Sequence, residues 1–310
     1  MAETMATRQA YGKTLIELGE KYPQLVVMDA DLSKSTMTAE FGKTYPDRFF
    51  NMGIAEQNLY GAAAGLALSG KIVCASTFAM FATGRAFEII RNSIGYTRAN
   101  VKICATHAGI TVGEDGASHQ TFEDIALMRT IPGMTVINPS DGVSAKKLLE
   151  QAVAMEGPCY VRLGRAKVPV FYEDSDQLTL GKGNLVRDGK DITIVATGIM
   201  VSEAMAAAEK LKEVGIDARI IDIHTIKPID EEILIKAAQE TGAIVTAEEH
   251  SIVGGLGSAV AEVIVKNCPV KMAMVGQKDT YGESGKPDEL KKKYGMTAED
   301  IEAAVKNLIG

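Results

Sequence analysis

The sequence predicts an α/β protein of two domains, each a mostly parallel sheet covered by helices. Short apolar runs bounded by Gly, Pro or Asn alternate with amphipathic helical segments, an order typical of parallel sheets with helices on both faces. The chain has 310 residues, enough for about two domains. Between residues 164 and 190 the alternation gives way to Pro, Gly, Asp and aromatic residues without a helical period. We therefore expect a first domain over 1–170, a linker over 171–188 and a second domain over 189–310.

In the first domain, apolar runs predict five strands and periodic segments predict four helices. The expected strands are 25–28, 71–75, 101–105, 135–137 and 159–161, and the expected helices are 8–21, 56–69, 82–94 and 140–155. Ser140 follows Pro139 at the start of the last helix, so we expect its side chain to cap that helix.

The second domain repeats the alternation of strands and helices. The expected strands are 192–196, 218–222, 243–247 and 270–275, and the expected helices are 202–214, 231–241 and 256–266. Thr297 and Asp300 precede a one-sided apolar stripe near the C-terminus. This pattern predicts a capped final helix.

The composition argues against several classes of protein. The net charge is −7, and Lys and Arg do not gather on one stripe, so a nucleic-acid partner is not expected. The four cysteines are far apart and form no Cys-x-x-Cys pair, which favours free thiols in a reducing compartment. No signal-peptide core is present, and no apolar run reaches the roughly 18 residues of a membrane span. We therefore expect a cytoplasmic protein without a membrane partner.

Glu56 begins a predicted helix whose next turns contain Gly61 and Gly65. These residues are too small to keep the helix away from a neighbouring surface. An acid in the first turn of a helix commonly complements the helix dipole and has no further role. On this segment alone, that is the simpler interpretation.

Phe78 and Phe81 lie where an expected strand leads into a helix. Aromatic residues three apart usually pack in a core, so these two need no ligand to explain them.

A glycine-rich stretch over 109–116 follows the expected strand 101–105, and the histidines His107 and His119 flank it. Asp115 lies within it. In α/β folds, ligands bind at this end of a parallel strand, and glycines let the backbone approach a ligand closely. A single histidine is most often structural, but two histidines and an acid in one segment are harder to explain that way. Zinc is disfavoured, because the histidines lack an adjacent thiolate or a two-His helical spacing.

Taken together, these segments resemble the C-terminal half of transketolase, with its pyrimidine-binding and C-terminal domains, over nearly the whole chain. The resemblance implies thiamine diphosphate as cofactor and a catalytic role for Glu56, which would share a proton with the aminopyrimidine ring. Phe78 and Phe81 would surround that ring, and Asp31 would lie near the cofactor. The family commonly has a further aromatic residue where this chain has Gly84.

The resemblance also implies a sugar-phosphate substrate. The residues that would bind it are Arg8, Ser35, His107, Asp115, His119 and Arg165. The two histidines would contact sugar hydroxyls or act in proton transfer, and the acid would hydrogen-bond the hydroxyl that distinguishes ketose configurations. The two arginines would hold the phosphate, because a guanidinium offers paired donors that match phosphate oxygens, and the serine would assist them.

The chain lacks the Gly-Asp-Gly sequence with which the family holds the diphosphate and a divalent ion. The resemblance therefore implies a separate N-terminal subunit that carries this site with Mg²⁺ or Ca²⁺, so that no metal ligand is expected in this chain. A heterotetramer of two small and two large chains is the implied assembly. Only with its partner would the chain transfer a two-carbon ketol unit from a ketose phosphate to an aldose phosphate, as in the pentose phosphate pathway.

Three alternatives stay open. The chain could be a subunit like deoxyxylulose-phosphate synthase, although that enzyme usually has Arg in place of His107. It could be like the beta subunit of a 2-oxo-acid dehydrogenase, although those subunits lack the Gly-Glu-Asp-Gly run. It could also be a non-catalytic assembly subunit of the same fold.

Two patterns in the second domain are weak signals of a ligand. The glycines of 254–257 lack the context of a dinucleotide site and predict close helix packing. Glu248, Glu249 and His250 make a poor chelate, because consecutive strand residues point to opposite sides. We therefore expect the second domain to support assembly more than chemistry.

Overall fold

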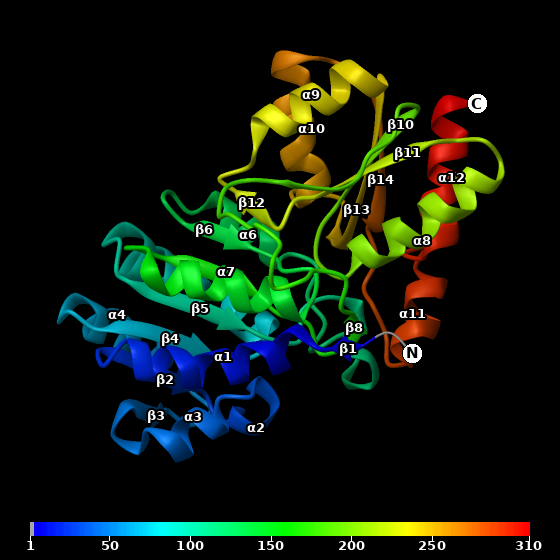
Figure 1. Cartoon of the computed structure of the whole chain (residues 1–310). Helices are drawn as coiled ribbons and strands as arrows, with labels where there is room; N and C mark the ends of the chain where they lie inside the picture. Colours follow the sequence, from blue (N-terminus) through cyan, green and yellow to red (C-terminus); the bar gives the residue numbers. More distant parts are fainter. Residues whose placement is uncertain (1–2) are drawn as a thin grey trace.

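The computed structural model describes residues 3–310 and contains one large sheet in each half of the chain. Figure 1 shows the N-terminal half, from blue to green, at lower left and the C-terminal half, from yellow-green to red, at upper right. Both sheets are mostly parallel and are covered by helices on both faces. The predicted fold class is therefore confirmed.

The first sheet has seven strands in the order β12-β6-β7-β5-β4-β2-β3, and neighbours are parallel except β12, which is antiparallel to β6. Its strands are β2 (Leu25–Asp29), β3 (Phe49–Asn51), β4 (Ile72–Ser76), β5 (Val101–Ala105), β6 (Thr135–Ile137), β7 (Cys159–Arg162) and β12 (Thr225–Lys227). Every residue of β2, β4, β5 and β7 is buried, as expected for strands covered on both faces.

Helices on the two faces of this sheet bury alternate residues of its strands. On one face, α1 (Thr7–Lys21), α3 (Ala39–Thr44) and α7 (Gly142–Ala154) pack against residues such as Val27. On the other face, α4 (Glu56–Leu68) and α6 (Asp124–Thr130) pack against residues such as Val26. The short helices α2 (Ser33–Thr36) and η1 (Pro46–Arg48) lead from β2 to β3.

The expected α-helix over 82–94 is wrong in its detail. The chain instead forms a π-helical turn η2 (Phe81–Arg85), a short α5 (Phe87–Ile89) and a second π-helical segment η3 (Ile90–Tyr96). The spacing of apolar residues in this segment does not distinguish the wider π-helical turns from α-helical ones. π-Helical turns often accompany functional sites.

The second sheet has the order β14-β13-β10-β11-β9, and only β9 is antiparallel to its neighbour. Its strands are β9 (Asn184–Arg187), β10 (Ile192–Ala196), β11 (Ala218–Asp222), β13 (Ala243–Ser251) and β14 (Lys271–Gln277). One face is covered by α8 (Met200–Glu213) and α12 (Ala298–Ile309), and the other by α9 (Glu231–Thr241) and α10 (Leu256–Asn267), while α11 (Pro287–Lys293) packs on the segment over 110–115. Strand β9 was not predicted and lies within the segment expected to be a linker.

The two halves share part of their core. Strand β12, which was not predicted, leaves the second half and extends the first sheet beside β6, as Figure 1 shows. One apolar core runs from α4 and α6 through Ile226 of β12 to α9 and α10. The short strands β1 (Thr4–Met5) and β8 (Val168–Pro169) pair antiparallel and join the two ends of the first half.

The two predicted helix caps have different outcomes. Thr297 caps α12, and its backbone N–H and its hydroxyl both donate to Asp300. Ser140 does not cap α7. Asp141 does so, because its carboxylate accepts from Ser144 N at 2.8 Å while the Ser140 hydroxyl donates to Asp222.

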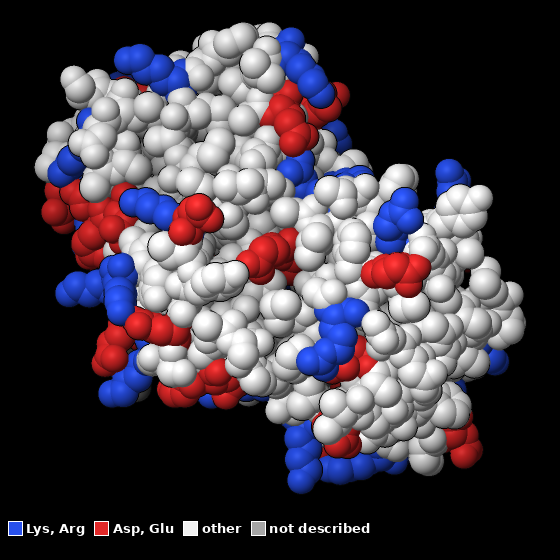
Figure 2. Space-filling model, turned by 180° about the vertical axis from the view of Figure 1, so that it is seen from behind, with Lys and Arg blue, Asp and Glu red and all other residues white. Residues whose placement is uncertain are grey.

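Charged side chains of both signs are interspersed on the face shown in Figure 2, and no patch of one sign covers it. None of the helices in the described part of the chain combines the length and apolar character needed to cross a bilayer.

Candidate active site

The candidate site lies where the parallel strands β2, β4 and β5 end. Beyond β4 and β5, Phe78 and Thr106 form a further parallel bridge, which brings the next residues of both strands side by side. The carboxyl ends of neighbouring parallel strands meet at one edge of a sheet, and this is where α/β proteins bind ligands. Phe78 and His107 are thus neighbours although they are far apart in sequence.

Glu56 is the first residue of α4 and is only 3% exposed. Arg85 Nη1 donates to both of its carboxylate oxygens, at 2.9 and 3.0 Å. The Arg85 side chain is itself 51% exposed. Since a buried carboxylate is costly without a cation or hydrogen-bond donors, Arg85 compensates the charge of Glu56.

Aromatic rings extend from this ion pair into the site. The Arg85 guanidinium carbon lies 4.7 Å from the centroid of the Phe81 ring. The Phe81 and Phe78 rings stack with centroids 5.9 Å apart, and Phe78 stacks on His107 at 3.9 Å. His119 lies edge-on to Phe81 at 5.3 Å. Five side chains from three separate segments therefore form one continuous wall.

His107 has a positive φ of 59°, which is uncommon for a residue other than glycine and directs its ring into this wall. Its Nδ1 lies 2.8 Å from Thr106 Oγ1, and its Nε2 lies 3.5 Å from Arg8 Nη1. Burial, followed by the charges of Arg8 and Arg165, lowers the pKa of His107 to about 3. The ring is therefore neutral near pH 7 and can donate or accept a hydrogen bond.

The two arginines of the predicted phosphate site lie close enough to affect each other. Arg8 Nη1 donates to the backbone oxygen of Ser35 at 2.7 Å, and Arg165 Nη1 donates to Val112 O at 2.7 Å and to Glu114 at 2.9 Å. Burial and the charge of Arg165 lower the pKa of Arg8. Two partly buried cations beside a neutral histidine favour an anion at this place.

Two predicted site residues lie outside this set of contacts. Asp31 has a positive φ of 65° after β2 and exchanges hydrogen bonds of 3.1 Å with Asn51. Asp115 is exposed at the end of the 3-10 helix η4 (Ile110–Asp115). Ser35 contributes its backbone oxygen, rather than its hydroxyl, to the contact with Arg8.

Arg85 and Glu249 contact the site or its loop and were not predicted to do so. Arg85 lies in the π-helical turn, which the periodicity could not show. Glu249 comes from the second sheet and accepts a hydrogen bond from Thr111 N at 2.6 Å. Its neighbour Glu248 accepts hydrogen bonds from the backbone N–H groups of Leu256 and Gly257.

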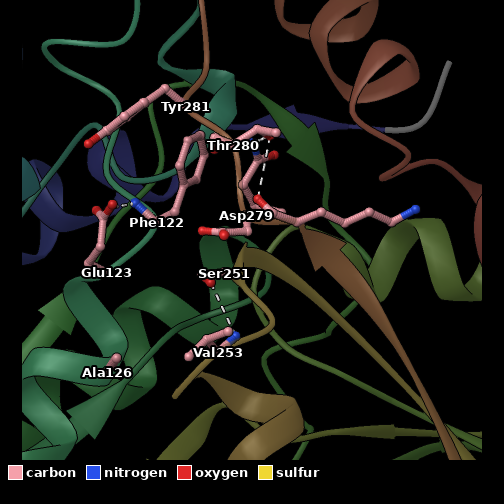
Figure 3. Close-up of a pocket in the computed structure, with 10 residues that line it drawn as sticks. Phe122, Glu123, Ala126, Ser251, Val253, Asp279, Thr280 and Tyr281 are labelled. Carbon is pink, nitrogen blue, oxygen red and sulfur yellow. Dashed lines mark hydrogen bonds between the residues drawn. The ribbon is translucent and has the colours of Figure 1, made fainter.

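A separate cavity of about 380 Å³ opens between the two halves of the chain (Figure 3). Its lining residues come from the start of α6 and from the ends of β13 and β14, and they include Phe122, Glu123, Ser251, Asp279 and Tyr281. None of the predicted site residues lines it. We therefore place the candidate site at Glu56 and His107 and not in this cavity.

The residues present fit one end of the implied cofactor. The Arg85 guanidinium is a planar group with N–H donors, and it bonds to Glu56 while lying over the Phe81 ring. An aminopyrimidine is also planar and carries amino donors, so the same carboxylate and aromatic face suit it. The other end of the cofactor, a diphosphate with its metal ion, finds no matching ligand set among the described residues. Within residues 3–310, no group of three or more His, Cys, Asp or Glu side chains could hold a metal ion.

Comparisons with known protein families and with individual proteins all point to transketolase. Residues 3–170 match the family model of the transketolase pyrimidine-binding domain, and residues 181–301 match that of the transketolase C-terminal domain. The chain is 57% identical over 297 residues to a putative transketolase C-terminal section of Methanocaldococcus jannaschii, covering 95% of this chain and 93% of that protein. It is 44% identical over 294 residues to a 6-deoxy-6-sulfo-D-fructose transketolase subunit of Clostridium sp., covering 95% of this chain and 91% of that protein.

Among solved structures, a split gene transketolase described as an inactive β4 tetramer is similar, with a TM-score of 0.91 and 53% identity over 98% of both chains. The chain therefore belongs to the transketolase family, as a C-terminal subunit of the split type.

Proposed function

We propose that this chain, together with an N-terminal subunit, transfers a two-carbon ketol unit from a ketose phosphate to an aldose phosphate. The observation that carries the proposal is the buried carboxylate of Glu56 beside the stacked rings of Phe81 and Phe78. These residues border a neutral histidine and two arginines. A buried acid, an aromatic face and an anion site in one place suit a thiamine enzyme that acts on sugar phosphates.

Thiamine diphosphate, when bound, supplies the nucleophilic carbon that attacks the ketose carbonyl. Glu56 would exchange a proton with the aminopyrimidine ring and keep that ring in the reactive tautomer. Phe81 and Phe78 would hold the ring by stacking and exclude water from it. Arg85, which is half exposed, would leave Glu56 to make room for the ring. Asp31 would lie at the rim of the cofactor site.

His107 and His119 would contact sugar hydroxyls and transfer protons. Since the pKa of His107 is about 3, it would act as a neutral donor or acceptor. Asp115, exposed on its loop, would select the hydroxyl configuration of the ketose. Arg8 and Arg165 would bind the substrate phosphate, and Ser35, whose backbone oxygen positions Arg8, would assist them.

We also propose that the partner subunit holds the diphosphate and its Mg²⁺ or Ca²⁺, and that two small and two large chains form the complex in the cytoplasm. The names of the relatives support a partner, because one is a C-terminal section and another is a subunit. The description of the solved relative as inactive supports the expectation that this chain alone has no activity.

Reconstitution tests the proposal. The chain, its N-terminal partner, or both would be incubated with thiamine diphosphate, Mg²⁺, a ketose phosphate and an aldose phosphate, and the products would be separated by chromatography. We expect a ketose two carbons longer than the acceptor aldose only in the mixture of both chains. Decarboxylation of a 2-oxo acid by the same mixture, without ketol transfer, would favour the alternatives instead.

A further inference from the structure

The loop over 109–121, here called the substrate loop, carries Asp115 and His119 and has a buried base. Its first and last residues are joined by a backbone hydrogen bond of 3.1 Å, from Gly109 N to Thr121 O. Residues 110–112 are fully or almost fully buried, whereas Asp115 is exposed. The loop therefore presents Asp115 outward from a buried base.

The second half of the chain contacts that base directly. Glu249 at the end of β13 accepts a hydrogen bond of 2.6 Å from Thr111 N through its Oε1. Gly109 has φ +80°, and a Cβ atom at this position would overlap the Glu249 carboxyl group. The carboxylate thus lies against the loop backbone, with no side chain between them.

Glu249 is held in place by Arg162 of β7, which is only 3% exposed. Arg162 Nη2 donates to the backbone oxygen of Glu249 at 2.8 Å, and its Nη1 lies 3.9 Å from Glu249 Oε2. The same guanidinium donates to Asp124 at 2.7 and 3.3 Å. Asp124 begins α6, just after the substrate loop ends. Arg162 therefore links Glu249, which contacts the base of the loop, to Asp124, which lies three residues beyond the end of the loop.

The neighbouring acid Glu248 offers a contrast. It lies in the same strand and is fully buried, but it accepts hydrogen bonds from Leu256 N and Gly257 N at the start of α10. A buried carboxylate needs such donors, and each of these two acids takes them from a different element. Of these two acids, Glu249 is the one that accepts a hydrogen bond from the substrate loop.

We propose that Glu249 is a positioning residue, which fixes Thr111 and thereby the loop that presents Asp115 and His119 to the sugar. The second domain then contributes to substrate recognition as well as to assembly. The effect on sugar binding rests on the proposed function, whereas the effect on the loop does not depend on it.

Hydrogen exchange of the Thr111 amide in the full chain tests the loop contact. Glu249→Ala removes the acceptor, and we expect the Thr111 amide to exchange about ten to a hundred times faster, the range for loss of a hydrogen bond to a charged group. Glu248→Ala is the matched control, because it removes an equally buried acid from the same strand. It should leave Thr111 exchange unchanged. Unchanged exchange in Glu249→Ala, or an equal increase in both variants, would overturn the proposal.

Kinetics of the reconstituted enzyme test the consequence for the substrate. In Glu249→Ala we expect the KM for the ketose phosphate to rise by about tenfold, more than kcat falls, while Glu248→Ala keeps the wild-type KM. Faster exchange with an unchanged KM would refute positioning. Faster exchange in an enzyme whose wild type transfers no ketol unit would leave the loop contact standing and reject the proposed function.

If Glu249→Ala does not fold, Glu249→Gln carries the test. Its amide oxygen can still accept from Thr111, but the charge facing Arg162 is lost. We expect a smaller increase in both Thr111 exchange and KM. Wild-type values of both would contradict the role of Glu249.

Discussion

Replacing Arg162 by alanine tests how much the buried charges beneath the substrate loop stabilise the fold. The substitution removes the hydrogen bonds to Asp124, of 2.7 and 3.3 Å, and the one to Glu249 O, of 2.8 Å. Asp124 and Glu249 are 0% and 2% exposed, so bulk water does not solvate their carboxylates. The variant therefore keeps two buried carboxylates without their cation.

Removing one partner of a buried ion pair typically costs about 3–5 kcal/mol, and we expect a loss of this size in the free energy of unfolding. The control is Lys43→Ala, whose partner is Glu40 and whose side chain is 72% exposed. An exposed pair of this kind contributes at most about 0.5 kcal/mol. Since the chain has no Trp, urea unfolding would be followed by far-UV circular dichroism.

The pH dependence of this loss has a defined sign. Burial alone would raise the pKa of Asp124, but Arg162, His250 and the hydrogen bond from Tyr160 together outweigh burial, and the pKa lies below its usual value. Without Arg162, only His250 and the hydrogen bond from Tyr160 oppose burial, so the pKa of Asp124 rises and folding takes up protons at mildly acidic pH. The variant should therefore regain part of its lost stability between pH 8 and pH 5. A cost below about 1 kcal/mol, or the same cost at both pH values, would refute this reasoning.

Four further predictions concern the site. Glu56→Gln should lower kcat of the reconstituted enzyme by about a hundredfold to ten-thousandfold, and wild-type turnover would reject a proton-transfer role. Arg165→Ala should weaken binding by about 1.5–3 kcal/mol, seen as a higher KM for phosphorylated sugars, and an equal effect on non-phosphorylated sugars would argue against a phosphate contact. Gly109→Ala should destabilise the chain by at least about 1–3 kcal/mol because of its positive φ, and an unchanged melting temperature would contradict this. His107, with a pKa of about 3, should stay neutral from pH 8 to pH 5 when followed by NMR. Because the same ring in the unfolded chain binds a proton near pH 6.5, its contribution lowers the free energy of unfolding as the pH drops below about 6.5. A ring that titrates near pH 6.5 in the folded chain would be inconsistent with its burial.

Much of the fold could be predicted because its main elements have strong local signals. The strand over 101–105 was predicted with its observed bounds, since an apolar run is bounded there by Asn and Thr. The strands β3 and β12 were not predicted, although the equally short β6 was, and β12 pairs with a strand far away in sequence. Pairing of that kind is decided by tertiary packing, and a local pattern does not show it.

The site shows the same division between local and distant contacts. His107 and Phe78 could be placed at one sheet edge, because both follow parallel strands. The contact of Arg85 with Glu56 depends on a π-helical turn, and that of Glu249 with Thr111 joins residues 138 positions apart. Neither contact follows from spacing in the sequence.

A structure of the reconstituted complex with thiamine diphosphate tests the central claim most directly. The account predicts the aminopyrimidine ring within hydrogen-bond distance of the Glu56 carboxylate and stacked on Phe81, with Arg85 displaced and the diphosphate bound by the partner subunit. A ring bound elsewhere, with the Arg85 and Glu56 ion pair intact, would contradict it.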